Sequence, residues 1–243
     1  MPSPVSPDTQ KDLAPTGKLR VGLNYGNFLL VLRDKPDGTP QGIAPDLARE
    51  LAKRLEMAIE FVKFDAAGKL ADGVKSGAWD VAFLGNEPQR AAEIAFSPAY
   101  LEIPVTYLVP AGSPIQALAD VDKQGVRVAV ADKSAYHLFM MRELKNAELV
   151  SADGIDGSYK LFIDSKLDAL AGLKPRLLTD QQKNPGSRVL EGQLTSVQQS
   201  IGTPKSRETA ARFLKEFAQD VKKSGLVKDL IERHKVPGVS VAP

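Results

Sequence analysis

The sequence predicts an α/β protein with two lobes, each built from a mostly parallel β-sheet flanked by helices. Three observations point to this class. Short apolar strand patterns alternate with amphipathic helix patterns. A break rich in Pro and Gly falls at residues 110–114, and the alternation then starts again. The 243 residues, 43% of them hydrophobic, can fill two lobes of about a hundred residues each.

The first lobe follows the order strand, helix, strand, helix, strand. The expected elements are a strand at residues 18–23, a helix at 45–55, a strand at 59–63, a helix at 69–76 and a strand at 80–84. Leu47, Leu51 and Leu55 form one apolar stripe at helical spacing. Such alternation implies a parallel sheet, which binds ligands at the carboxyl ends of its strands. Those ends are residues 24–28 and 85–90.

The second lobe repeats the architecture without repeating the sequence. A strand at 104–109 leads into the break, followed by strands at 126–131, 148–150 and 167–171, helices at 134–145 and 158–165, and late strands at 188–190 and 195–201. The longest amphipathic helix is expected to open at Thr203-Pro204, and a last helix covers residues 226–234.

The break at residues 110–114 marks the first crossing between the two lobes. Residues 1–16 are polar and rich in proline, so we expect a disordered leader there.

Composition excludes several classes of function. A formal net charge of +2 provides no broad cationic surface for nucleic acid. No apolar run approaches the ~20 residues of a membrane-spanning helix. With no cysteine, disulfides, thiolate catalysis and cysteine-held metals are excluded. The histidines, His137 and His234, lack metal-ligand spacing and are expected on the surface. No hydrolase, P-loop or dinucleotide motif occurs, so we expect no catalytic residue, metal or cofactor.

Arg90 is the most informative charged residue, because it follows the strand at 80–84 at the expected ligand edge of the first sheet. An arginine there can bind a carboxylate through two parallel hydrogen bonds. The alternative is a surface ion pair with Glu87 or Glu93. Ser134 is a candidate helix N-cap, which either offers an anion site or only caps its helix.

Other residues at the same strand ends complete the candidate site. Tyr25, Phe28 and Tyr136 can wall a pocket, although core packing is an equal alternative for Phe28. Polar or backbone contacts are expected from Asn24, Asn27, Gly85, Asn86 and Gly172. Lys133 and the segment at 174–176 are interpreted as solvated charge.

Several segments in order carry a resemblance to a known family. They are LRVG at 19–22, GIAPDLARELAKRL at 42–55, GAWDVA at 77–82, RAAEIAFSPAY at 90–100, VRVAV at 126–130 ahead of Ser134, and LDA at 167–169. Together they resemble the bacterial extracellular solute-binding proteins of family 3, the periplasmic amino-acid-binding type.

The resemblance implies a periplasmic-binding-protein fold of type II, the Venus-flytrap fold, with two crossing strands as hinge near residues 104–110 and 195–201. It places the second crossing within residues 188–201, so that lobe 1 comprises residues 17–106 plus 199–240 and lobe 2 comprises residues 107–198. It also implies that residues 1–16 follow a removed signal peptide. It implies a non-enzymatic protein of the periplasm. A monomer is the default expectation for the oligomeric state. Such a protein closes around a small amino acid or related organic acid in the interlobe cleft and delivers it to the membrane permease of an ABC importer. Arg90 matches the family's ligand-carboxylate arginine, and Ser134 matches the small hydroxyl residue at the second-lobe helix start.

Two departures from the family pattern affect the ligand. The chain between Asp80 and Arg90 is short, and residues 84–88 replace a hydroxyl-rich loop. Residues 171–174 contain no acid where such binders place an ammonium-pairing aspartate. A carboxylate ligand without a free amino group is therefore a serious alternative to an amino acid.

Two rival functions use the same fold. One is a lyase similar to cyclohexadienyl dehydratase, for which Glu87 is the acid available in the loop before Arg90. The other is a ligand-sensing domain of a signalling protein.

Overall fold

The chain forms two compact α/β units, which confirms the predicted fold class. The computed structural model describes residues 5–32 and 34–243. Unit 1 comprises the chain up to Leu101, Gln198–Val236 and Ser240–Pro243, and unit 2 comprises Glu102–Val197 and Pro237–Val239. The chain changes unit within strands β5 (Leu101–Val109) and β10 (Thr195–Pro204). The sequence placed these changes at 106/107 and 198/199.

Unit 1 contains a sheet in the order β2-β1-β3-β10. Its strands are β1 (Leu19–Asn24), β2 (Ile59–Phe64), β3 (Val81–Gly85) and the end of β10, with the short β4 (Ile94–Phe96) paired to β10. Strands β1, β2 and β3 are parallel, whereas β10 runs antiparallel to β3. The predicted β-α-β-α-β order is therefore confirmed, and the carboxyl ends of β1 and β3 lie at one edge.

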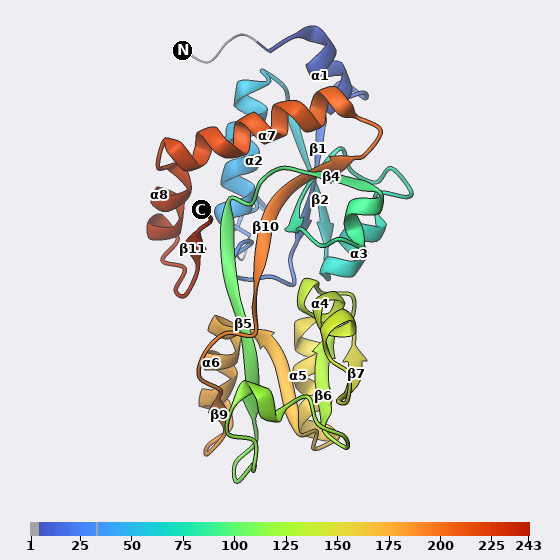
Figure 1. Cartoon of the computed structure of the whole chain (residues 1–243). Helices are drawn as coiled ribbons and strands as arrows, with labels where there is room; N and C mark the ends of the chain where they lie inside the picture. Colours follow the sequence, from blue (N-terminus) through green and yellow to red (C-terminus); the bar gives the residue numbers. More distant parts are fainter. Residues whose placement is uncertain (1–4, 33) are drawn as a thin grey trace. The chain divides into compact units, whose positions relative to one another are not determined.

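Helices cover both faces of this sheet (Figure 1). They are α2 (Ile43–Arg54), α3 (Ala67–Asp72), α7 (Glu208–Lys223) and α8 (Leu226–Arg233); a two-residue strand β11 (Ser240–Val241) follows. Helix α3 packs closest at Gly22, where a Cβ would lie 2.5 Å from Leu70 Cδ1. Trp79 then fixes the helix end by donating from Nε1 to the Leu70 carbonyl at 2.8 Å. Only glycine leaves room for this approach.

A buried carboxylate joins the amino ends of the unit-1 strands. Asp80 is fully buried and forms ion pairs with Arg20 at 2.7 Å and Arg207 at 2.9 Å. It also accepts from the backbone N–H of Arg20, while its own N–H donates to the Arg20 carbonyl. The start of β1, the residue before β3 and the approach to α7 are thus held by one side chain. A buried charge is tolerated because it is paired and fully hydrogen-bonded.

The prediction of a disordered leader is wrong for Pro7–Leu13, which form helix α1. Asp12 accepts from the backbone N–H of Ala210 at 2.8 Å, so it caps the amino end of α7. Gln10 donates to the Leu55 carbonyl at 2.8 Å, at the carboxyl end of α2. Leu13 is fully buried. Helix α1 is therefore held in place by hydrogen bonds to the amino end of α7 and to the carboxyl end of α2. Residues 1–4 of the predicted leader lie outside the described residues.

Helix α7 begins at Glu208, later than the predicted start at Thr203-Pro204. Thr203 and Pro204 instead continue β10, where they pair with β4. The Thr203 hydroxyl also donates to the Asp80 carbonyl at 3.0 Å. Pairing with strands distant in sequence overrides the local helix-start signal.

Unit 2 contains a sheet in the order β5-β8-β6-β7. Its remaining strands are β6 (Arg127–Ala131), β7 (Glu148–Ala152), β8 (Ala169–Leu173) and β9 (Arg188–Val189), and its helices are α4 (Ala135–Glu143), α5 (Gly154–Asp164) and α6 (Lys174–Lys183). Short 3₁₀ turns occur at Arg90–Ala92 in unit 1 and Leu118–Asp120 in unit 2. Helix α6 was not predicted.

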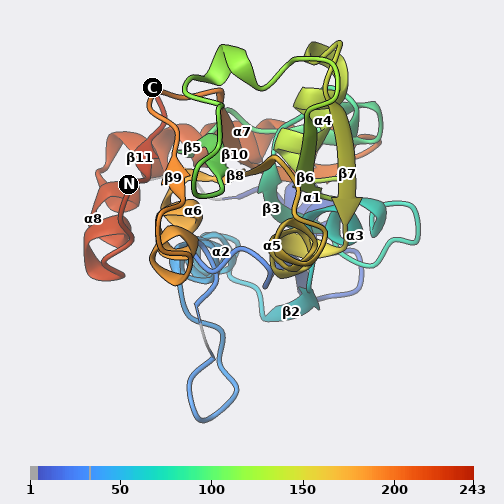
Figure 2. The same ribbon diagram turned by 90° about the horizontal axis from the view of Figure 1, so that it is seen from below.

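The unit-2 core lies between this sheet and α5 with α6 (Figure 2). Phe162 of α5 and Leu177 of α6 pack against Leu108, Ala129 and Leu170 of the strands. On the opposite face, the hydroxyl of Tyr107 contacts the sulfur of Met140 in α4 at 3.6 Å. Both faces of the sheet are covered, as a parallel core requires.

The Arg20–Asp80 arrangement of unit 1 recurs in unit 2. Asp168, just before β8, accepts from the backbone N–H of Arg127 at 2.8 Å and lies 3.5 Å from the Arg127 guanidinium. The Asp168 N–H donates back to the Arg127 carbonyl. Asp168, however, is 41% exposed, whereas Asp80 is 0% exposed.

This difference in burial predicts different stability losses. Asp80→Ala removes the fully buried carboxylate that Arg20 and Arg207 share, and should lower the free energy of unfolding by about 3–5 kcal/mol. The matched change Asp168→Ala breaks the equivalent contact in water and should cost about 1 kcal/mol. Urea unfolding monitored by circular dichroism measures both, and equal losses would contradict the burial argument.

The capping role of α1 is tested separately. Asp12→Ala removes the acceptor at the start of α7 and should lower the free energy of unfolding by about 1 kcal/mol. The exposed neighbour Lys11→Ala is the control, expected to change it by less than about 0.5 kcal/mol. If the two variants unfold at the same urea concentration, α1 does not cap α7.

Candidate functional site

In each unit, parallel strands bring the predicted site residues to one sheet edge. Leu23 of β1 pairs with Phe83 of β3, so the loops that follow Asn24 and Gly85 start side by side in unit 1. In unit 2, Val128 of β6 pairs with Ala169 of β8. The turn before α4 and the start of α6 therefore share an edge as well.

Arg90 is buried at the unit-1 edge, with only 7% of its surface exposed. Its Nη1 donates to the carbonyl of Gly85 at 2.7 Å, and its backbone N–H donates to the Glu87 carbonyl at 2.9 Å. Burial lowers the pKa of Arg90 to about 10, although the negative charges of Glu87 and Asp72 act to raise it. The guanidinium is thus charged at neutral pH and held by the last residue of β3.

Asn24 and Asn27 use their side chains to shape the loop after β1. Asn24 Oδ1 accepts from the Gly26 N–H at 3.0 Å, and Asn27 Oδ1 accepts from the Leu29 N–H at 3.2 Å. Asn27 is buried, whereas Phe28 is 38% exposed and is not a core residue. The two asparagines therefore hold a turn at the ligand edge.

Tyr25 points to a local charge pair. Its hydroxyl donates to Asp34 at 2.9 Å, and Lys63, which pairs with Asp34, lies 5.0 Å from its ring centre. Burial raises the pKa of Tyr25, and the hydrogen bond to Asp34 adds to this rise. Asn86 is exposed and donates its backbone N–H to the Gln198 carbonyl. The structure thus gathers seven predicted residues at the unit-1 edge: Asn24, Tyr25, Asn27, Phe28, Gly85, Asn86 and Arg90.

Ser134 caps helix α4 in unit 2, as predicted. Its Oγ accepts from the His137 N–H at 3.1 Å. The chain enters the cap through Lys133, whose φ of 49° is left-handed and whose N–H donates to His137 Nδ1 at 3.0 Å. His137 is buried, so the expectation of a surface histidine is wrong. Burial lowers the pKa of His137 and so favours the neutral ring, although the negative charge of Asp132 acts to raise it.

Tyr136 and Gly172 lie at the same edge of unit 2. The Tyr136 side chain is buried, and its hydroxyl has no hydrogen-bond partner among the described residues. Burial raises its pKa to about 12, while Ser134 and the charge of Arg176 lower it. Gly172 serves packing, because a Cβ there would lie 3.0 Å from Leu177 Cδ2 of α6.

Arg176 was interpreted as solvated charge, and that interpretation is wrong. Its side chain is 11% exposed and pairs with Asp180 and Asp156, each at 2.7 Å. Burial acts to lower the pKa of Arg176, but the hydrogen bonds to Asp180 and Asp156 outweigh it and raise this pKa above its usual value. The spacing of Arg176 and Asp180 by four residues, typical of a helical ion pair, was the available signal.

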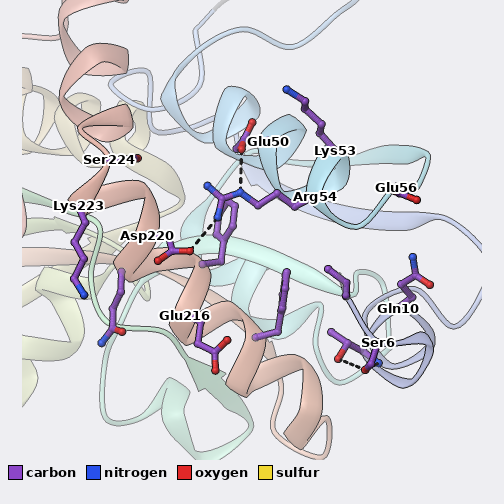
Figure 3. Close-up of a pocket in the computed structure, with 15 residues that line it drawn as sticks. Ser6, Gln10, Glu50, Lys53, Arg54, Glu56, Glu216, Asp220, Lys223 and Ser224 are labelled. Atoms are coloured by element: carbon purple, nitrogen blue, oxygen red, sulfur yellow. Dashed lines mark hydrogen bonds and ion pairs between the residues drawn. The ribbon is translucent and has the colours of Figure 1, made fainter. Parts of the chain in front are cut away.

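A groove elsewhere in unit 1 contains none of the predicted residues. It encloses about 1270 Å³ between α1, α2 and α7. Figure 3 shows Arg54 reaching between Glu50 and Asp220, at 2.9 and 3.4 Å. The guanidinium also lies 4.9 Å from the Phe217 ring centre. Four acidic side chains, Glu50, Glu56, Glu216 and Asp220, line this groove, so it is not the predicted anion site.

Residues 5–32 and 34–243 contain no group of three His, Asp or Glu side chains placed to hold a metal ion. Within the same ranges, no helix has the length and apolarity to cross a membrane.

Solved structures with the same fold include several binding proteins. The chain is similar to the solute receptor for L-cysteine of Neisseria gonorrhoeae, with a TM-score of 0.78 and 22% identity over 94% of each chain. A mutant of ArgBP from T. maritima matches with a TM-score of 0.76 and 22% identity, covering 93% of this chain and 98% of that one. A putative ABC-transporter binding component from Wolinella succinogenes, complexed with lysine, matches with a TM-score of 0.73 and 23% identity over 90% and 95%.

The family itself is identified from the sequence. Residues 19–236 match the bacterial extracellular solute-binding proteins, family 3. This span includes every strand of unit 1 from β1 to β10 and all of unit 2 up to Val197. The chain therefore belongs to the bacterial extracellular solute-binding proteins of family 3.

Proposed function

We propose that this protein is the periplasmic solute-binding component of an ABC importer. It binds a small carboxylate-bearing metabolite, an amino acid or a related organic acid, and delivers it to a permease. Family membership supports the class of function. The single observation that supports the ligand class is Arg90, a buried and charged guanidinium at the carboxyl edge of the unit-1 sheet.

Arg90 suits a carboxylate for two physical reasons. Its guanidinium presents N–H groups in a planar fork that matches two carboxylate oxygens. It is also removed from water, and a charge pair is stronger where water is excluded. The bond from Nη1 to the Gly85 carbonyl holds the fork in place, so less conformational freedom is lost when a ligand binds.

Unit 2 contributes Ser134 in this proposal. The hydroxyl already caps α4, and the first N–H groups of that helix carry the positive end of its dipole.

Glu87 supports binding over lyase chemistry. A general acid needs a proton and access to the substrate. Glu87 instead interacts with the charge of Arg90 in the same loop. It acts as a counter-ion that helps to keep the guanidinium charged.

Replacing Arg90 tests the proposal directly. The ligand is first identified by native mass spectrometry of the purified protein, or by a melting screen of amino acids, keto acids and aromatic acids. Arg90→Ala should weaken its binding at least about 100-fold, because the buried charge-assisted bonds are lost. Arg90→Lys, which retains charge without the fork, should be intermediate.

The matched control is Arg212→Ala, an exposed arginine on α7. It should leave affinity unchanged within about twofold. Isothermal titration calorimetry measures all variants, with the melting temperature of each ligand-free protein recorded alongside. If the Arg90→Ala variant binds the ligand with wild-type affinity, Arg90 does not bind the ligand carboxylate.

Binding should also respond to alkaline pH. The pKa of Arg90 is about 10 in the ligand-free protein. Above it the guanidinium loses its proton, which must be regained before a carboxylate binds. The dissociation constant should be constant up to about pH 9 and then rise about tenfold per pH unit above pH 10.

An exposed arginine would keep its charge past about pH 12 and show no such rise. Titrations between pH 7 and 11, with circular dichroism confirming folding at each pH, separate the two outcomes.

A further inference from the structure

A histidine completes the helix start at the carboxyl edge of the unit-2 sheet. Ser134 Oγ accepts from the backbone N–H of His137 at 3.1 Å, and His137 Nδ1 accepts from the backbone N–H of Lys133 at 3.0 Å. This reciprocal arrangement resembles a capping box, with histidine in place of the usual glutamate or glutamine. The Ser134 N–H is already bonded to the Ala131 carbonyl at 3.2 Å, so the ring reaches one residue further back.

The bond to Lys133 requires an unprotonated Nδ1. A backbone N–H can only donate, so Nδ1 uses its lone pair and the neutral ring carries its proton on Nε2. A protonated imidazole has an N–H at both nitrogens and cannot accept. Gain of one proton by His137 therefore breaks this bond, which makes the helix start sensitive to pH.

Asp132 offers the protonated ring another partner. Its Oδ1 lies 3.5 Å from the same Nδ1. Both atoms are acceptors while the ring is neutral, but a protonated Nδ1 can donate to the carboxylate. Burial lowers the pKa of His137, whereas the charge of Asp132 acts to raise it. One nitrogen thus has two alternative partners, and its protonation decides between them.

The turn at residues 132–134 depends on the bond to the neutral ring. Lys133 has a φ of 49°, a left-handed conformation that is unfavourable for a residue with a side chain. Loss of the bond to His137 removes one of the contacts that keep this turn in place. A ligand that needs the turn then binds only to the fraction of molecules in which it is formed, so its apparent affinity falls.

The other charged residues around this helix start do not pair with the ring. They are Lys133 in the same turn, Asp153 after β7, and Lys174 and Arg176 after β8. Asp122 lies beyond the opposite end of α4, where it accepts from the backbone N–H groups of residues 145–147. Asp132 is therefore the charged group that competes with the Lys133 N–H for the ring.

We propose that His137 is a positioning residue of the ligand site: its neutral ring holds the turn at residues 132–134, and its protonation at mildly acidic pH lowers ligand affinity. The inference rests on the proposed function, to which unit 2 contributes Ser134. It adds regulation of that same site by pH.

The first experiment observes the ring itself. The chain has two histidines, His137 and His234, so labelling with ¹⁵N-histidine gives two assignable rings. Long-range ¹H–¹⁵N spectra should show His137 as the Nε2–H tautomer at pH 7.5. Its pKa should lie below about 6.5, and the amide signal of Lys133 should shift with the same midpoint. An Nδ1–H tautomer, or a Lys133 amide that does not follow the titration, overturns the proposal.

The second experiment measures ligand affinity by calorimetry between pH 4.5 and 7.5, with the ligand found by the screen above. His137→Ala removes the acceptor and should weaken binding about fivefold at pH 7.5. His137→Asn places a carbonyl oxygen near the position of Nδ1 and does not titrate, so it should recover most of this loss. Wild-type affinity should fall towards that of His137→Ala as the pH decreases, whereas His137→Asn should show no such fall.

Two further variants test the exchange of partners. Asp132→Asn removes the charge that raises the pKa of His137, so the loss of affinity should move to lower pH. The control is His234→Asn, which changes the other histidine, bonded to Asp46 in unit 1 at 2.7 Å, and should keep the wild-type pH profile. An unchanged midpoint in Asp132→Asn, or a flat profile in His234→Asn, contradicts the exchange at His137.

These measurements separate the role of His137 from the proposed function. If Arg90→Ala abolishes binding while wild type and His137→Asn show the same pH profile, the ligand site stands and the role of His137 is overturned. If no acid binds the wild-type protein at any pH, the proposed function fails and the positioning role with it. Circular dichroism at each pH confirms that all variants are folded.

Discussion

The buried Asp80 carboxylate is the constraint on which the rest of unit 1 depends. It joins Arg20 at the start of β1, the entry to β3 and Arg207 ahead of α7. Because the amino ends of the parallel strands are held together there, their carboxyl ends meet at the opposite edge. That edge positions Gly85, whose carbonyl in turn holds the Arg90 guanidinium. A bond at one end of the sheet thus sets the geometry of the site at the other.

Unit 2 uses the same arrangement in a weaker form. Asp168 binds Arg127 at the amino end of β8 and β6, and Arg176 follows at the carboxyl end. Each unit therefore pairs an aspartate before a central strand with an arginine after it. In unit 1 the arginine is held by a carbonyl, and in unit 2 by a buried carboxylate.

Part of the candidate site could be predicted from the sequence, because its position follows from strand order. Arg90 and Ser134 were found this way, as each directly follows a predicted strand. The turn that Asn24 and Asn27 hold is local, because each side-chain oxygen accepts from the backbone N–H two residues further on. The role of Gly172 could not be found this way, because it depends on a contact with Leu177 of helix α6. Arg176 was misjudged because its burial depends on the unpredicted helix α6.

The sequence by itself determined the α/β class, the order of the strands and the family, because apolar periodicity and segment order are local properties of the chain. Only the tertiary structure decided that residues 7–13 form a helix and that Thr203 belongs to a strand. Asp12 bonds to Ala210, and Thr203 bonds to Asp80, across more than a hundred residues in each case. It also decided that the Tyr136 side chain is buried, with no hydrogen-bond partner for its hydroxyl oxygen among residues 5–32 and 34–243. Such long-range bonds, and the lack of one, leave no periodic trace in the sequence.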